Sequence, residues 1–361
     1  MRYVSALKNW PEVIPLLSAV ILYACLSLSV TGIVAFGIFI VMMSAVITSV
    51  HHAEVIAHRL GEPFGTLVLA LAVTVIETSL ILSIMLTDSG KNASLPRDTI
   101  YSAVMIICNG VVGLSLLIGG LHHKEQLFRI EGTGSGFAAL ATLSILVLVM
   151  PLFTISSAEG TYTNSQLIFI ALSSLALWLV FIFIQTIRHR DYFLPSISVD
   201  DESVHAPPPT QSQAWISFAL MLVSLFSVVG LAKLLSPFIK SIVTVYDAPE
   251  AAVGIVIAMI VLLPETWAAL RAAKADRLQT SMNLAIGSAL ASIGLTIPLV
   301  VIFSVIYKID LVLGIDTKDV VLLSLTFLVG SITLGSGKTN MMQGAIHILL
   351  FAAFLFLTLI P

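Results

Sequence analysis

The chain has 361 residues, of which 58% are hydrophobic and only 10% are charged, whereas soluble domains carry about 25% charged residues. Its mean hydropathy of +1.05 requires that most of the chain face lipid or a packed membrane interior. The net charge of −3 offers no basic surface for nucleic acid. Both cysteines lie in apolar runs, so neither a disulfide framework nor a CxxC metal site is expected. Composition therefore predicts an all-α polytopic membrane protein.

Apolar runs of about 18–25 residues, the length of a membrane-spanning helix, predict about 11 transmembrane helices. The runs lie at 13–30, 33–57, 64–87, 98–120, 135–157, 164–187, 215–235, 250–273, 282–308, 317–334 and 340–360. The first run has no small-residue cleavage motif after it, which favours a retained helix over a signal peptide.

A long polar stretch at 188–214 separates the sixth run from the seventh and has the acidic, proline-rich composition of a flexible linker. If the N-terminus is cytoplasmic, 11 of the 17 Lys and Arg residues fall in cytoplasmic segments and 6 in outer ones, as the positive-inside rule requires. The linker is then cytoplasmic as well. We expect it to tolerate removal of residues 197–210, and we expect a multi-pass protein of the cell inner (plasma) membrane.

The run order also predicts an internal repeat. Residues 1–32 form an extra N-terminal helix, 33–187 hold five helices, and 215–361 hold five more after the linker. Because five is odd, the second set must insert upside-down relative to the first. Inverted repeats are typical of secondary transporters, whose substrates bind near the membrane midplane.

Matched carboxyl groups in the two repeats support this interpretation. Glu62 precedes Glu77 by 15 residues, and Glu250 precedes Glu265 by 15. Glu77 and Glu265 each lie near the centre of an apolar run, where a charged group costs about 2.5–3.5 kcal/mol on insertion scales and usually has a function. Such a pair can hold protons or a hard cation, which prefers oxygen ligands. The alternative for each is a protonated carboxyl group, hydrogen-bonded inside the bundle.

Five further residues are candidate supports of a cation site: Thr74, Asn109, Pro264, Ser288 and Ser292. Thr74 lies three residues before Glu77, on the same helical face. Pro264 should break its helix locally and free backbone carbonyls. The two serines form an i,i+4 stripe, and Gly287 beside them should permit close helix approach. Except for Pro264, interhelical hydrogen bonding explains each of these residues equally well.

Other motifs give weaker evidence of function. His58, Glu62 and Glu250 are expected to line entrances to the site, and the histidines at 51, 52 and 58 match no metalloenzyme motif. We therefore expect no catalytic metal and no cofactor. The glycine-rich segment 132–136 is expected to form a flexible turn.

Four segments match the motifs of one known protein family. Residues 54–77 resemble the family's first repeat, with its GEx(x)G entry and G-N-x-x-E motif. Residues 262–265 and 283–289 resemble the second repeat, and 339–344 are similar to the S-N-x-x-E-G opening of the last helix. By these segments the chain resembles the cation/proton exchangers of the cation/calcium antiporter superfamily, and in particular their bacterial ChaA-type branch.

This resemblance implies that Glu77 and Glu265 are the ion-binding carboxylates. It also implies that Ser288 belongs to the GS motif of the family's second repeat, and that Asn109 matches an asparagine of the fourth helix. It implies exchange of Ca²⁺, Na⁺ and K⁺ for protons. Thr74 and Leu262 replace the two G-N-x-x-E asparagines, so strict Ca²⁺ selectivity is not expected.

The sequence thus predicts a secondary active transporter that exchanges cytoplasmic Ca²⁺, and Na⁺ or K⁺, for protons. Its partners are inorganic cations, protons and the lipid bilayer, with no nucleic acid; the oligomeric state stays open. Two alternatives from other classes are a passive cation channel, disfavoured by the lack of a repeated filter loop or charge ring, and an intramembrane enzyme, disfavoured by the lack of a complete nucleophile or metal constellation.

Overall fold

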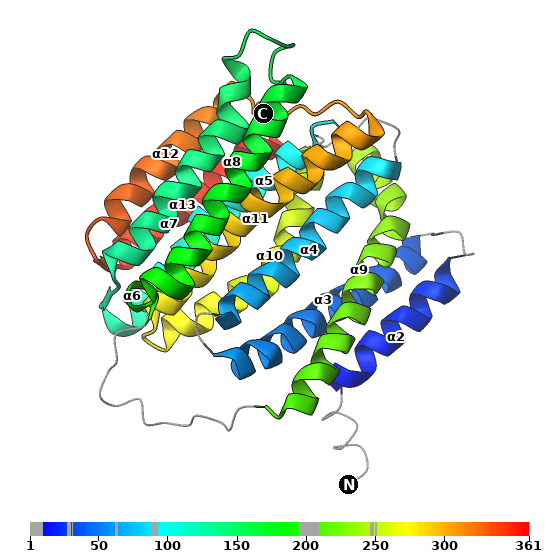
Figure 1. The fold of residues 1–361 in the computed structure, drawn as a ribbon, viewed down its shortest axis with the longest axis horizontal. Coiled ribbons are helices and arrows are strands. Elements are labelled where there is room, and N and C mark those ends of the chain that lie inside the picture. The colour runs from blue at the N-terminus through cyan, green and yellow to red at the C-terminus, as the bar shows by residue number, and fades with distance from the viewer. Residues whose placement is uncertain are drawn as a thin grey trace. The chain divides into compact units, whose positions relative to one another are not determined.

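The structure, a computed structural model, describes residues 10–26, 30, 32–61, 64–87, 93–194, 209–245, 249 and 251–360. Within these ranges, helical segments occupy the positions of all eleven predicted runs (Figure 1). Their contacts divide the chain into two compact units. The first unit comprises Met1–Ser89 with Val199–Asp247, and the second comprises Gly90–Ser198 with Ala248–Pro361. This grouping by contact differs from the predicted grouping by sequence repeat, so the repeat boundaries stay a prediction.

Among its described residues, the first unit contains four helices: α2 (Trp10–Cys25), α3 (Gly32–Leu60), α4 (Phe64–Thr87) and α9 (Gln211–Val245). Helix α9 packs against the other three. Gly230 brings α9 close to α2, because a Cβ atom there would lie 2.5 Å from a methyl carbon of Leu22. Between α3 and α9 the buried hydroxyls of Thr48 and Ser224 lie 3.4 Å apart.

The second unit holds the remaining helices. Helix α5 (Leu95–Met105), the π-helix η1 (Ile106–Val111) and α6 (Val112–His123) follow one another directly, and α7 (Ile130–Ser144) continues into η2 (Ile145–Val149) and η3 (Met150–Leu152). After α8 (Asn164–Phe183) come η4 (Ile184–Arg188) and η5 (Arg190–Phe193). The last four helices are α10 (Ala251–Lys274), α11 (Leu278–Tyr307), α12 (Thr317–Leu334) and α13 (Met341–Leu359). Helix α11 is the core of the unit, since it packs against α7, α8 and α10 and most of its side chains are buried.

In the described ranges, 8 helices are long and apolar enough to cross a membrane, and the two pieces of α10 would make a ninth span. Those pieces, Ala251–Leu263 and Glu265–Lys274, differ in direction by 52°. The bend falls at Pro264, whose missing N–H was expected to break the helix there. Helix α2 and the apolar part of α4, Leu71–Met85, are shorter apolar helices, so the total of eleven spans stays a prediction. The chain is a multi-pass membrane protein.

Two local features were not predicted. Strands β1 (Glu125–Leu127) and β2 (Lys338–Asn340) pair antiparallel, with Gln126 opposite Thr339. The glycine-rich segment 132–136 lies inside α7, so the predicted flexible turn is wrong. Gly132 and Gly136 instead allow neighbouring elements to pack closely against α7. A Cβ atom at Gly132 would lie 2.6 Å from the carbonyl oxygen of Tyr192, and one at Gly136 would lie 2.9 Å from Ile286.

Candidate functional site

Glu265 of the second unit lies at the bend of α10 and is only 3% exposed. The hydroxyl of Ser288, on α11, donates a hydrogen bond of 2.5 Å to its Oε2 atom. Ser292, one turn further along α11, is also buried. The structure therefore brings together the predicted carboxyl group and one of its predicted supports, and places both beside a broken helix.

Gly287 precedes Ser288 and was predicted to permit close helix approach, but the described residues show no close contact there. A Cβ atom built there would meet no heavy atom of the described residues within 4 Å. The residues on either side of it, Ile286 and Ser288, are both buried. Gly287 thus leaves space next to the Glu265–Ser288 pair, where a larger side chain would take up room.

Glu77 belongs to the first unit, on α4, and is 1% exposed. Thr74 and Thr78, at i−3 and i+1, are buried as well, whereas Val75 is 46% exposed. Helix α4 packs against α3 and α9. A buried face of α4 therefore carries a carboxyl group together with hydroxyl groups, as the helical spacing of Thr74 and Glu77 predicted.

Asn109 is fully buried in the π-helix η1, a rare element that often marks functional sites. Its Nδ2 atom donates to Thr326 Oγ1 of α12 at 2.9 Å. Its Oδ1 atom lies 3.1 Å from Nδ1 of His347 on α13, and because a carbonyl oxygen can only accept, the histidine nitrogen is the donor. His347 Nε2 lies 3.2 Å from Thr333 Oγ1. These contacts match the interhelical alternative for Asn109.

Sequence reasoning missed His347, Thr326 and Thr333 as partners of Asn109. All three lie in apolar runs and are at most 2% exposed. A histidine near the middle of an apolar helix was the available signal, because ionisable residues there are rare and usually have a partner.

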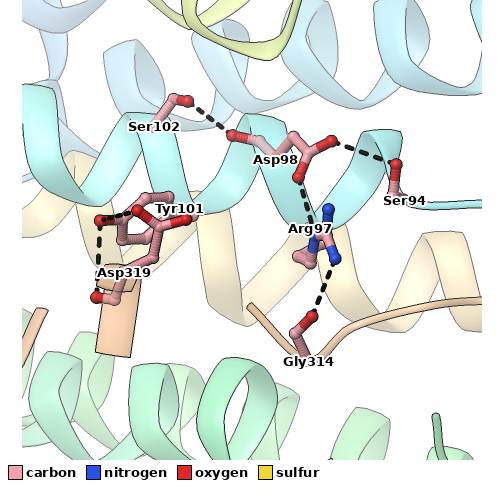
Figure 2. A network of polar contacts seen from close by, with 7 residues as sticks. All are labelled: Ser94, Arg97, Asp98, Tyr101, Ser102, Gly314 and Asp319. Atoms are coloured by element: carbon pink, nitrogen blue, oxygen red, sulfur yellow. Dashed lines mark hydrogen bonds and ion pairs between the residues drawn. The ribbon is translucent and has the colours of Figure 1, made fainter. Parts of the chain in front are cut away.

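A second unpredicted network lies at the start of α5 (Figure 2). Arg97 donates to Asp98 Oδ1 at 2.7 Å and to the carbonyl oxygen of Gly314 at 2.9 Å. Tyr101, one turn along, donates to Asp319 Oδ1 at 3.2 Å. These charge-assisted bonds tie α5 to the segment before α12 and to the first turn of α12. The network therefore anchors helices within the second unit.

Of the three predicted entrance residues, the structure describes only His58. Glu62 and Glu250 lie outside the described residues. His58 is exposed and lines a pocket of about 470 Å³ in the first unit, together with His51 and His52. The Nε2 atom of His52 lies 2.8 Å from the carbonyl oxygen of Pro11. Among the residues that the structure describes, no group of three or more His, Cys, Asp or Glu side chains is arranged to hold a metal ion.

Comparison with known proteins identifies the family. The family model for sodium/calcium exchanger proteins matches residues 28–187 and 216–360. The chain is 45% identical over 323 residues to the putative ionic transporter y4hA of Sinorhizobium fredii, covering 89% of this chain and 87% of that protein. It is 34% identical over 354 residues to the sodium-potassium/proton antiporter ChaA of Escherichia coli, covering 96% of this chain and 95% of that protein.

Its fold is similar to that of the H⁺/Ca²⁺ exchanger CAX in its crystal structure, with a TM-score of 0.73 at 16% identity over 98% of this chain and 87% of that one. The chain therefore belongs to the sodium/calcium exchanger protein family, and the resemblance drawn from its sequence is confirmed.

Proposed function

We propose that this protein is a secondary antiporter of the cell inner (plasma) membrane that exchanges cytoplasmic Ca²⁺, and also Na⁺ and K⁺, for protons. The names of two similar proteins support the reaction type: one is a sodium-potassium/proton antiporter and the other an H⁺/Ca²⁺ exchanger. The observation that carries the proposal is the burial of Glu77 and Glu265, at 1% and 3% exposure, inside apolar helices.

The chemistry of exchange follows from those two carboxyl groups. Hard cations bind through carboxylate, carbonyl and hydroxyl oxygens, and a proton on the same carboxyl group removes the charge that attracts the cation. Protons and cations therefore compete for Glu77 and Glu265. At Glu265 the hydroxyl of Ser288 supplies one further oxygen, and Pro264, at the bend of α10, has no N–H to donate to the carbonyl oxygen four residues earlier.

The proposal includes a topology. An N-terminal helix within 1–32 is followed by two inverted five-helix repeats, 33–187 and 215–361, with the N-terminus and the linker 188–214 in the cytoplasm. Inverted repeats of this kind present a site alternately to the two sides of the membrane. Glu77 and Glu265 then occupy corresponding helices of the two repeats.

Flux in proteoliposomes tests the reaction. We expect Ca²⁺, Na⁺ and K⁺, added one at a time, each to drive proton movement in the opposite direction, recorded with a pH-sensitive dye inside the vesicles. A passive cation channel would carry cations under a membrane potential without moving protons uphill, and an intramembrane enzyme would carry neither.

The two glutamates are tested by Glu77→Gln and Glu265→Gln. Glutamine keeps the shape and hydrogen bonding of the side chain but cannot bind or release a proton, so we expect each variant to insert normally and to lose exchange. Glu125→Gln is the matched control, because Glu125 lies exposed on β1 and should leave exchange unchanged. Coupled exchange retained by either buried variant would remove that residue from the mechanism.

A further inference from the structure

A groove of about 980 Å³ lies within the first unit, between α2 and α9. Leu22, Tyr23, Phe226 and Phe238 form much of its wall. The contact between Leu22 and Gly230 closes the space between the two helices at this level. The groove thus has a floor and two apolar sides, and its volume is that of a small-molecule site, which typically has about 300–1,000 Å³.

The apolar side of the groove opens outward. Tyr23 is 80% exposed and Phe226 is 72% exposed, and in a membrane protein such side chains face lipid tails. An elongated apolar molecule that enters from the bilayer can therefore lie against Leu22 and Phe226.

The groove also contains a cationic side chain, which lies between Phe226 and Phe238 along α9. Of the described residues that line it, Lys233 alone carries a charge. Lys233 is exposed and lies near the C-terminal end of the apolar run 215–235, where a lysine side chain can extend toward the lipid headgroups. Pro237, four residues further along α9, also lines the groove. Because proline has no N–H, the backbone carbonyl of Lys233 lacks its usual helical donor. An ammonium group and a carbonyl acceptor are thus available in the same turn.

We propose that this groove binds one anionic phospholipid with a hydroxylated headgroup, such as phosphatidylglycerol. The phosphate accepts hydrogen bonds from Lys233, a headgroup hydroxyl donates to the Lys233 carbonyl, and an acyl chain fills the apolar part beside Leu22 and Phe226. Basic residues at the membrane boundary bind anionic lipids in this way. A concave site of this volume with a single cation suits one lipid molecule better than the flat face of a second copy of the chain.

Native mass spectrometry of the full-length protein tests the headgroup contact. With phosphatidylglycerol or phosphatidylcholine added at equal concentration, we expect the unmodified protein to retain several-fold more phosphatidylglycerol. Lys233→Gln should abolish that preference. Lys308→Gln, at an exposed lysine that ends α11, should keep it. Equal retention of the two lipids, an unchanged preference in Lys233→Gln, or a dimer that forms in place of lipid binding would each overturn the proposal.

Fluorescence quenching by brominated lipid tests the contact with the acyl chain. In a protein whose four native tryptophans are replaced by phenylalanine, Tyr23→Trp puts a fluorophore in the groove, and Tyr307→Trp puts one at an exposed site outside it. Brominated phosphatidylglycerol, titrated into phosphatidylcholine vesicles, should quench the Tyr23→Trp signal at a several-fold lower lipid fraction than the Tyr307→Trp signal. Equal titration curves would mean that bulk lipid alone fills the groove. Both measurements are independent of transport.

Discussion

At the scale of single residues, the hydroxyl of Ser288 is the best-defined support of a candidate ion-binding carboxyl group. It donates to Glu265 within a buried environment, and a hydrogen bond to a charged group contributes about 1.5–3 kcal/mol. We expect Ser288→Ala to reduce cation exchange by roughly tenfold or more, since 1.4 kcal/mol corresponds to a factor of ten. Ser288→Thr keeps the hydroxyl and should retain most of the exchange. Equal rates for the alanine variant and the unmodified protein, measured in proteoliposomes, would contradict this role.

A second prediction at this scale concerns selectivity. Leu262 is 2% exposed and lies three residues before Glu265, where the G-N-x-x-E motif named above has asparagine. Ca²⁺ takes about 6–8 oxygen ligands, so a site with fewer amide oxygens should discriminate weakly and also accept Na⁺ and K⁺. We expect exchange of all three cations at mildly alkaline pH, where fewer protons compete, and a shift toward Ca²⁺ in Leu262→Asn. If the unmodified protein exchanges Ca²⁺ with no detectable Na⁺ or K⁺ exchange, this ligand count does not determine selectivity.

At the scale of helices, glycines decide how closely α6 and α13 pack. A Cβ atom at Gly113 of α6 would lie 2.9 Å from Cβ of His347 and 3.1 Å from the backbone nitrogen of Ile348. Gly113→Ala must push α13 away and disturb the hydrogen bond between His347 and Asn109. Overpacking of this kind costs about 1–3 kcal/mol, so we expect a clearly lower thermal unfolding temperature in detergent.

Gly287→Ala is the matched control for helix packing. In the part of the chain that the structure describes, a Cβ atom there meets no heavy atom within 4 Å, and alanine favours a helix over glycine by about 1 kcal/mol. The unfolding temperature of Gly287→Ala should therefore equal or exceed that of the unmodified protein. A similar loss of stability in both variants would show that the loss reflects glycine replacement in general, and not the contact between α6 and α13.

At the scale of the whole molecule, the linker between the predicted repeats is anchored at its edges. Phe193, in the first part of the polar stretch, is buried and its carbonyl oxygen accepts a hydrogen bond from Asn283 Nδ2. At the other edge, the Pro209 carbonyl accepts from Arg59 and Thr210 caps the start of α9. Residues 195–208 lie outside the described residues.

Because of these contacts, we expect a shorter part of the linker to tolerate removal than the sequence alone predicted. Removal of residues 197–207 should leave exchange and stability unchanged, whereas removal of 190–194, which takes away Phe193, should reduce both. Exchange in vesicles and unfolding in detergent measure the outcome. Cleavage of the linker by protease added outside intact cells would contradict its predicted cytoplasmic location, and loss of transport on removal of 197–207 would contradict its tolerance.

The sequence by itself determined the membrane class, the positions of the helices and the family, and it singled out Glu77 and Glu265, which are both buried. Hydropathy over about 20 residues is a local property, so runs such as 64–87 and 317–334 coincide with α4 and α12. Tertiary structure decided which side chains meet. Asn109 pairs with residues 217 and 238 positions away, and no local pattern contains such partners. The same limit explains the glycines: only the neighbouring elements distinguish the open space at Gly287 from the close contact at Gly132.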